Sequence, residues 1–200
     1  MLAIKALRRA RPGKKQRGQS LVEFAISSTV LLLLAMGLLD LSRAFYFAVN
    51  LQGAAREGAR HAAWYNTNSR TSPYLYDTEV FNTVKQSLYG AGLKDSQINL
   101  VTSAGCLTPT DGNTLNNKPY ASSAFPSTAG NVNVYICYTD PTGAKSASRA
   151  SAPTDNSWRL GDVNVSILMN FQLITPFIQG LFGNGLNVAY NEHFTIQGKP

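Results

Sequence analysis

The sequence predicts an α+β fold, in which a long N-terminal transmembrane helix extends into a domain with an antiparallel sheet and one packed helix. Three observations lead to this prediction. An apolar run near the N-terminus has the length of a membrane span, a later stretch repeats apolar residues at helical spacing, and several stretches beyond it alternate apolar and polar residues. A content of 44% hydrophobic and 14% charged residues is typical of a folded chain.

The first element is a basic N-terminal segment. Residues 1–17 hold seven of the eighteen Lys and Arg residues and no Asp or Glu, so basic and acidic residues are equal in number from residue 18 onward. A basic block directly before an apolar run is typical of a topogenic signal, whereas a nucleic-acid-binding protein more often carries its positive charge on the folded domain. We therefore expect no nucleic-acid partner.

The second element is the apolar run from Leu21 to Leu39. Its nineteen residues carry one charge, on Glu23, and a helix of this length spans roughly 28 Å, close to the hydrocarbon core of a bilayer. By the positive-inside rule the basic flank stays in the cytoplasm, which predicts a single-pass protein of the cytoplasmic membrane with an exported C-terminal domain. Two alternatives are a cleaved signal peptide, for which the run is long, and a buried core helix, for which the leucines at 31–34 leave no polar face.

Beyond the span we expect the helix to continue to about Trp64. Arg56, Glu57 and Arg60 fall within one turn, with Glu57 and Arg60 three residues apart, and form either a solvated face or a contact with another subunit. Small residues also recur every three or four positions. They form a stripe that permits close helix packing: Ala44, Ala48, Ala55, Gly58, Ala59, Ala62 and Ala63.

A polar break at residues 66–73 is expected to end the long helix and to begin the exported domain. A helix capped by Asp77 and running to about Tyr89 comes first. Strand-like alternation follows at residues 98–102, 132–138, 163–171 and 186–196, and predicts an antiparallel sheet with one buried face. Residues 176–182 (PFIQGLF) form a short helix, a lid on the sheet edge or a membrane-proximal patch; we favour packing over membrane contact.

Cys106 and Cys137 both fall in the exported part, where an oxidising compartment favours a disulfide over two unpaired thiols. Closing a loop of this size stabilises a domain by roughly 3 to 4 kcal/mol in the chain-entropy model. The cysteines have no His or Asp neighbours at ligand spacing, which argues against a metal site. The long polar stretches at 107–131 and 139–157 are expected to be mobile or to form binding surfaces.

The sequence carries no catalytic signature. His61 and His193 fall in no recognised motif, the acidic residues are spread singly, and Gly-rich phosphate loops are absent. We therefore expect no enzymatic activity, no catalytic residue, no cofactor and no metal.

Residues 17–24 (RGQSLVEF) resemble the processing motif of type IV and Flp-type prepilins, and residues 38–63 are similar to the TadE-like family of minor pilin-like proteins of the tight-adherence (Flp pilus) system. The resemblance implies cleavage between Gly18 and Gln19 by a prepilin peptidase. It divides the chain into a basic cytoplasmic leader (1–18), a transmembrane and extended helix (19–65) and an exported pilin-like domain (66–200). Many relatives have proline where Thr29 stands, so we expect a straighter helix here.

The resemblance assigns Glu23 and Phe24 to assembly. A carboxylate inside the apolar run is costly in lipid unless it reaches the interface or meets a positive partner. Cleavage after Gly18 would give Gln19 a free α-amino group, with which Glu23 of a neighbouring subunit could pair on assembly. Without cleavage, Glu23 reaches the interface of a static anchored subunit.

The function that the resemblance implies is that of a membrane-anchored minor pilin or pseudopilin, involved in assembling a tight-adherence (Flp-type) pilus or secretion apparatus and thereby in cell adhesion. Its partners would be the membrane, a prepilin peptidase, and other pilin-like and pilus-assembly subunits. A permanently anchored extracytoplasmic binding or adhesion domain and a soluble domain released by signal peptidase are the alternatives. The mature N-terminus separates the three: Gln19, Met1, or a residue beyond about 37.

Overall fold

The computed structural model describes residues 16–68, 70–102, 105–107, 118–143, 146–148, 152, 154–183 and 185–197. Residues 1–15, most of the predicted leader, lie outside this set. The chain forms two compact units, Met1–Leu39 and Asp40–Pro200. The predicted division at residues 18 and 65 concerns processing and the side of the membrane, and it stays a prediction.

Helix α1 (Gln16–Ala63) is continuous and ends one residue before the predicted Trp64. In the first unit its large apolar side chains are exposed in the isolated chain, among them Phe24, Leu31 and Leu38. Thr29 donates its hydroxyl to the carbonyl of Ala25 at 2.9 Å. Among the described residues, α1 is the one helix long and apolar enough to cross a membrane. This agrees with single-pass anchoring.

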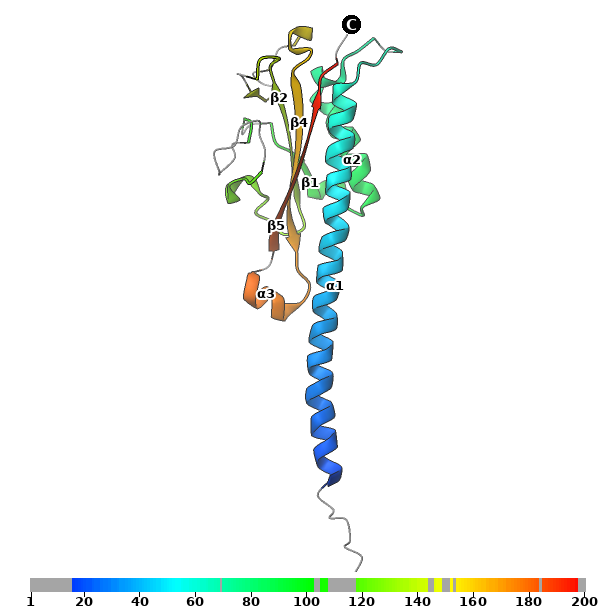
Figure 1. Cartoon of the computed structure of the whole chain (residues 1–200), viewed down its shortest axis with the longest axis vertical. Helices are drawn as coiled ribbons and strands as arrows, with labels where there is room; N and C mark the ends of the chain where they lie inside the picture. The colour runs from blue at the N-terminus through cyan, green and yellow to red at the C-terminus, as the bar shows by residue number, and fades with distance from the viewer. Residues whose placement is uncertain are drawn as a thin grey trace, which may run out of the picture. The chain divides into compact units, whose positions relative to one another are not determined.

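The second unit is built on a sheet that confirms the predicted α+β class (Figure 1). Its strands pair in the order β1-β2-β4-β5, and β3 pairs with β2. Their bounds are β1 Ile98–Leu100, β2 Val132–Thr139, β3 Ser146–Ala147, β4 Asp162–Gln172 and β5 Gly185–Thr195. The sheet is mostly antiparallel, but β1 runs parallel to β2. This confirms the predicted antiparallel sheet except for β1, which is separated from β2 by 31 residues of sequence, long enough for a parallel connection.

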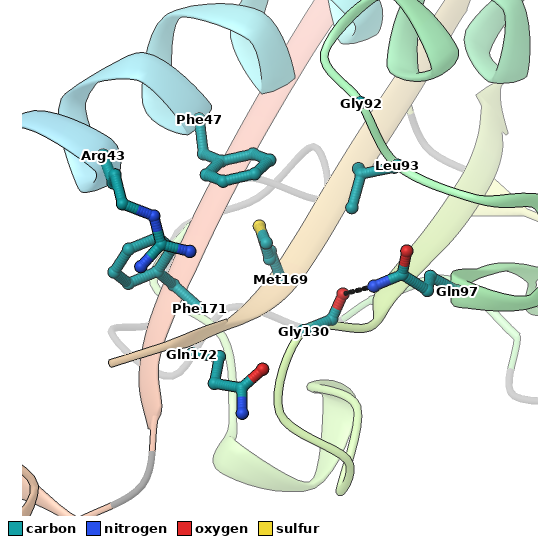
Figure 2. Close-up of a pocket in the computed structure, with 9 residues that line it drawn as sticks. All are labelled: Arg43, Phe47, Gly92, Leu93, Gln97, Gly130, Met169, Phe171 and Gln172. Carbon is teal, nitrogen blue, oxygen red and sulfur yellow. Dashed lines mark hydrogen bonds between the residues drawn. The ribbon is translucent and has the colours of Figure 1, made fainter. Parts of the chain in front are cut away.

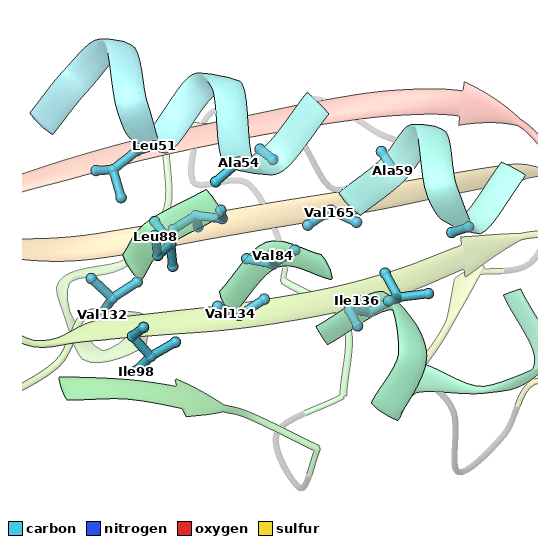
Figure 3. Packing of buried hydrophobic residues seen from close by; sticks show 14 of the residues in the cluster. Leu51, Ala54, Ala59, Val84, Leu88, Ile98, Val132, Val134, Ile136 and Val165 are labelled. Atoms are coloured by element: carbon cyan, nitrogen blue, oxygen red, sulfur yellow. The ribbon is translucent and has the colours of Figure 1, made fainter. Parts of the chain in front are cut away.

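Two helices cover one face of the sheet. The second half of α1 and helix α2 (Asp77–Gly90) pack their buried side chains against β2 and β4 (Figure 3). The strand residues that face them alternate along each strand, as the sequence predicts. They are Val132, Val134, Ile136, Tyr138, Val163, Val165, Ile167, Met169 and Phe171.

The small residues of α1 serve this packing. Ala55 and Ala59 are fully buried, and a Cβ built on Gly58 would collide with a methyl group of Val84 in α2 and lie 3.6 Å from Val165 in β4. The stripe predicted to permit close packing therefore brings α1 against α2 and the sheet of its own domain.

The opposite face of the sheet is also covered, which corrects the prediction of one buried face. Leu107, Tyr120, Tyr135 and Leu168 form a second buried cluster there. The hydroxyl of Tyr135 donates to the carbonyl of Ala124 at 2.7 Å, and a disulfide joins Cys106 to Cys137, with 5.6 Å between their Cα atoms. The described part of the 107–131 stretch is thus a packed cover.

One feature of the shorter helices, the cap of α2, differs from expectation. Tyr76, and not the predicted Asp77, is the N-cap residue of helix α2. Asp77 is the first residue of the helix, and its carboxylate accepts a hydrogen bond of 2.5 Å from the hydroxyl of Tyr138.

Residues 176–182 form helix α3 (Pro176–Phe182). Its Ile178 packs against the core, whereas Phe177, Leu181 and Phe182 are exposed. Single 3-10 turns complete the described chain: η1 Pro73–Leu75, η2 Asp95–Gln97, η3 Ser122–Ala124 and η4 Asn156–Trp158.

Candidate functional site

The N-terminal turns of α1 carry the residues of the predicted processing and assembly site. Gly18, Gln19, Glu23 and Phe24 are all exposed. The side-chain amide of Gln19 donates to the Glu23 carboxylate at 3.3 Å, across one helical turn. The carboxylate therefore lies on the helix surface among apolar side chains. Such a group can pair with a cation that another molecule brings.

A second exposed feature of α1 lies within the second unit. Leu41, Phe45 and Val49 are four residues apart and more than half exposed, so they form one apolar strip along the helix. The buried side chains that face the sheet begin with Leu51 and Ala54. This part of α1 thus has one face buried in its own domain and one apolar face that the domain leaves uncovered.

The charged turn at Arg56, Glu57 and Arg60 lies further along α1. The Arg60 guanidinium donates twice to the Glu57 carboxylate, at 3.2 and 2.7 Å, and Arg56 is exposed. The hydrogen bond from Arg60 is the main reason why the pKa of Glu57 lies below its ordinary value. Glu57 and Arg60, together with His61 and Trp64, line a shallow surface recess. A solvated face and a subunit contact both remain open for this turn.

Sequence reasoning missed the role of Asp40. This carboxylate is 4% exposed and, among the described residues, it is the one buried Asp, Glu, Lys or Arg. It accepts hydrogen bonds from the backbone N–H groups of Ile174 (3.1 Å) and Thr175 (2.9 Å), and Arg43 approaches it at 3.4 Å. The available signal was an acidic residue directly after the apolar run and three residues before an arginine.

A small cavity of about 110 Å³ lies next to Arg43 (Figure 2). Its walls are apolar at Phe47, Leu93 and Met169 and polar at Gln97 and Gln172. The Arg43 guanidinium stacks 5.4 Å from the ring centre of Phe171. This volume is well below the roughly 300 Å³ at which small-molecule sites begin, so the cavity fits a few waters or one side chain.

The described residues place no metal-binding group together. No cluster of three or more His, Cys, Asp or Glu side chains occurs among them. His193 on β5 lies 2.5 Å from the Asp162 carboxylate on β4, a pair that links the two strands. His61 lies on α1, far along the chain from both. The expectation that the protein is not an enzyme stays a prediction.

Comparison with known proteins finds a match for one part of the chain. Residues 18–60 match the family model described as TadE-like protein. No curated protein and no solved structure matches the chain. The matched stretch includes Gly18, Glu23 and the charged turn of α1, and it ends before α2 and the sheet. Residues 18–60 are therefore a TadE-like segment, which confirms the family that residues 17–24 and 38–63 predicted.

Proposed function

We propose that this protein is a membrane-anchored minor pilin or pseudopilin that takes part in assembling a tight-adherence (Flp-type) pilus or secretion apparatus. Residues 21–39 span the cytoplasmic membrane, with the basic N-terminus in the cytoplasm and the sheet domain outside. A prepilin peptidase cleaves between Gly18 and Gln19. The partners are other pilin-like and pilus-assembly subunits.

The observation that carries this proposal is the two-faced α1 of the TadE-like segment. One face of its exported half is buried against the chain's own sheet, while Leu41, Phe45 and Val49 leave an apolar strip on the outside. A folded domain that keeps such a strip uncovered has a surface suited to another helix. This supports lateral association of α1 with other subunits.

Glu23 supplies specificity in this scheme. Its exposed carboxylate has a weak neutral partner in Gln19 at 3.3 Å, which a stronger cationic partner can displace. Cleavage after Gly18 creates such a cation on the same turn of a neighbouring subunit. Pairing the two charges removes the cost of holding each alone in lipid, so that assembly is favoured over the separate subunits.

The test is the N-terminal sequence of the membrane-extracted protein, expressed with and without a co-expressed prepilin peptidase. A start at Gln19 only with the peptidase supports the proposal. A start at Met1 in both samples contradicts pilin-type maturation. Glu23→Ala then tests assembly: we expect it to reduce co-isolation with other pilus subunits, whereas Glu79→Ala, which removes an exposed carboxylate of α2 outside the span, serves as the matched control.

A second candidate function is a permanently anchored binding or adhesion domain. It is favoured by an open recess of about 430 Å³ on the outer side of the sheet, lined by Lys118, Tyr120, Phe125 and residues of β5. The Lys118 ammonium lies 5.0 Å from the ring centre of Tyr190. An unprocessed N-terminus, together with a monomer in detergent, would favour this function.

A further inference from the structure

Helix α3 presents an apolar surface that its own domain does not cover. Phe177, Leu181 and Phe182 are 60%, 66% and 65% exposed, and Ile174 just before the helix is 57% exposed. Ile178, which lies between them on the helix, is half-buried against the core. The helix therefore packs through Ile178 while three large apolar side chains stay exposed, and such an apolar surface needs a partner.

The Asp40 carboxylate fixes where this surface lies along the chain. Its oxygens accept hydrogen bonds from the backbone N–H groups of Ile174 and Thr175, the two residues that precede α3. Asp40 directly follows Leu39, the last residue of the apolar run, so the start of α3 is hydrogen-bonded to the first residue after that run.

The chemistry of the segment suits lipid. No Asp, Glu, Lys or Arg occurs between Asp162 and Glu192 in the sequence, so no charge near α3 would have to leave water. The polar side chain of Gln179 is already used, because its amide donates to the carbonyl of Leu173 at 2.6 Å. The helix also ends sharply, with Gly183 at a φ of 82°.

We propose that α3 is an interfacial anchor: Ile174, Phe177, Leu181 and Phe182 insert into the headgroup and acyl boundary of the bilayer that α1 spans. Apolar faces of interfacial helices bury in this layer. The exported domain then has two attachments to the membrane, one through α1 and one through α3, joined by Asp40. This inference requires the membrane span but not the pilus role.

Photo-crosslinking of the full chain in phospholipid vesicles tests the anchor. The photoreactive residue p-benzoyl-phenylalanine replaces Phe182 in one variant, Phe24 of the span in a second, and Tyr89, an exposed aromatic residue of α2, in a third. We expect lipid adducts at Phe24 and at Phe182, and severalfold fewer at Tyr89. Mass spectrometry of the labelled peptides identifies the adducts.

Each other result overturns the inference in a distinguishable way. Lipid adducts at Phe24 with none above the Tyr89 level at Phe182 would remove the anchor and leave the span intact. Adducts from Phe182 to a second copy of the chain would assign the surface to self-association. An absence of lipid adducts at Phe24 would reject the span and the anchor together.

A charge variant adds a second measurement with the probe placed at Phe177. Leu181→Asp puts a carboxylate into the proposed lipid-facing surface, and we expect it to lower the lipid adducts severalfold. Gln86→Asp adds the same charge to the exposed side of α2 and should leave the adducts unchanged. Circular dichroism of both variants verifies that the domain is folded. Equal adduct yields in the two folded variants would contradict the anchor.

Discussion

The two halves of α1 differ in which of their side chains are exposed and which are buried. Before residue 40, large apolar side chains such as Leu31 and Leu38 project on all sides and are exposed in the isolated chain. After residue 40, the helix has one buried face, which includes Leu51 and Ala55, and one exposed face. The difference teaches that helical propensity is shared by both halves, while side-chain size and pattern differ: the second half packs against a protein core, and the first half has the length and composition of a membrane span.

The largest test of this comparison replaces one leucine in each half. Leu51→Ala removes a fully buried side chain from the core between α1 and the sheet, and should lower the free energy of unfolding of the second unit by about 3 kcal/mol. Leu32→Ala removes an exposed side chain from the first half. It should leave that free energy unchanged.

The measurement for this pair is denaturant unfolding of the full chain in detergent, followed by tryptophan fluorescence. Trp158 packs against the core of the exported domain and reports its unfolding. Equal destabilisation by Leu51→Ala and Leu32→Ala would mean that the two halves do not differ in their surroundings as proposed.

The second test concerns the boundary between the halves. Asp40→Ala leaves the N–H groups of Ile174 and Thr175 without their acceptor in a buried place. The expected loss of unfolding free energy is about 2 kcal/mol, since buried donors that lose a partner carry the cost of desolvation. Asp40→Asn, which keeps one acceptor oxygen, should lose less. An unchanged midpoint in both variants would show that this contact does not hold α3.

Much of this fold could be predicted from pattern alone. The positions of β2, β4 and β5 follow from the alternation of apolar residues along the sequence, and the ends of α1 and α2 follow from the residues that break the helical pattern. The parallel pairing of β1 could not be predicted, since three residues carry no signal of direction. The second buried face depends on Tyr120 and Leu107, which lie in polar stretches whose composition gives no sign of packing.

Some contacts of the candidate site could likewise be predicted from the sequence, and others could not. Gly18, Glu23 and Phe24 could be found because they form a local motif, and the pairing of Glu57 with Arg60 because three residues separate them. The contact of Asp40 with Thr175 joins residues 135 positions apart through backbone N–H groups. Backbone donors have no residue identity, so no pattern in the sequence could point to this contact.

The smallest and most discriminating test uses two glycines in the second half of α1. Gly53 has open space where a Cβ would lie, whereas a Cβ on Gly58 would meet Val84, whose branched side chain is fully buried and cannot turn away. Alanine is the better helix former by about 1 kcal/mol at either position. Gly53→Ala should therefore stabilise the domain by up to that amount. In Gly58→Ala overpacking, which typically costs about 1 to 3 kcal/mol, outweighs the helical gain, so the domain should be destabilised. Thermal unfolding midpoints of the two variants should thus move in opposite directions. A rise in both would mean that α1 can move away from α2 at no cost, and that the small-residue stripe is not needed for packing within the chain.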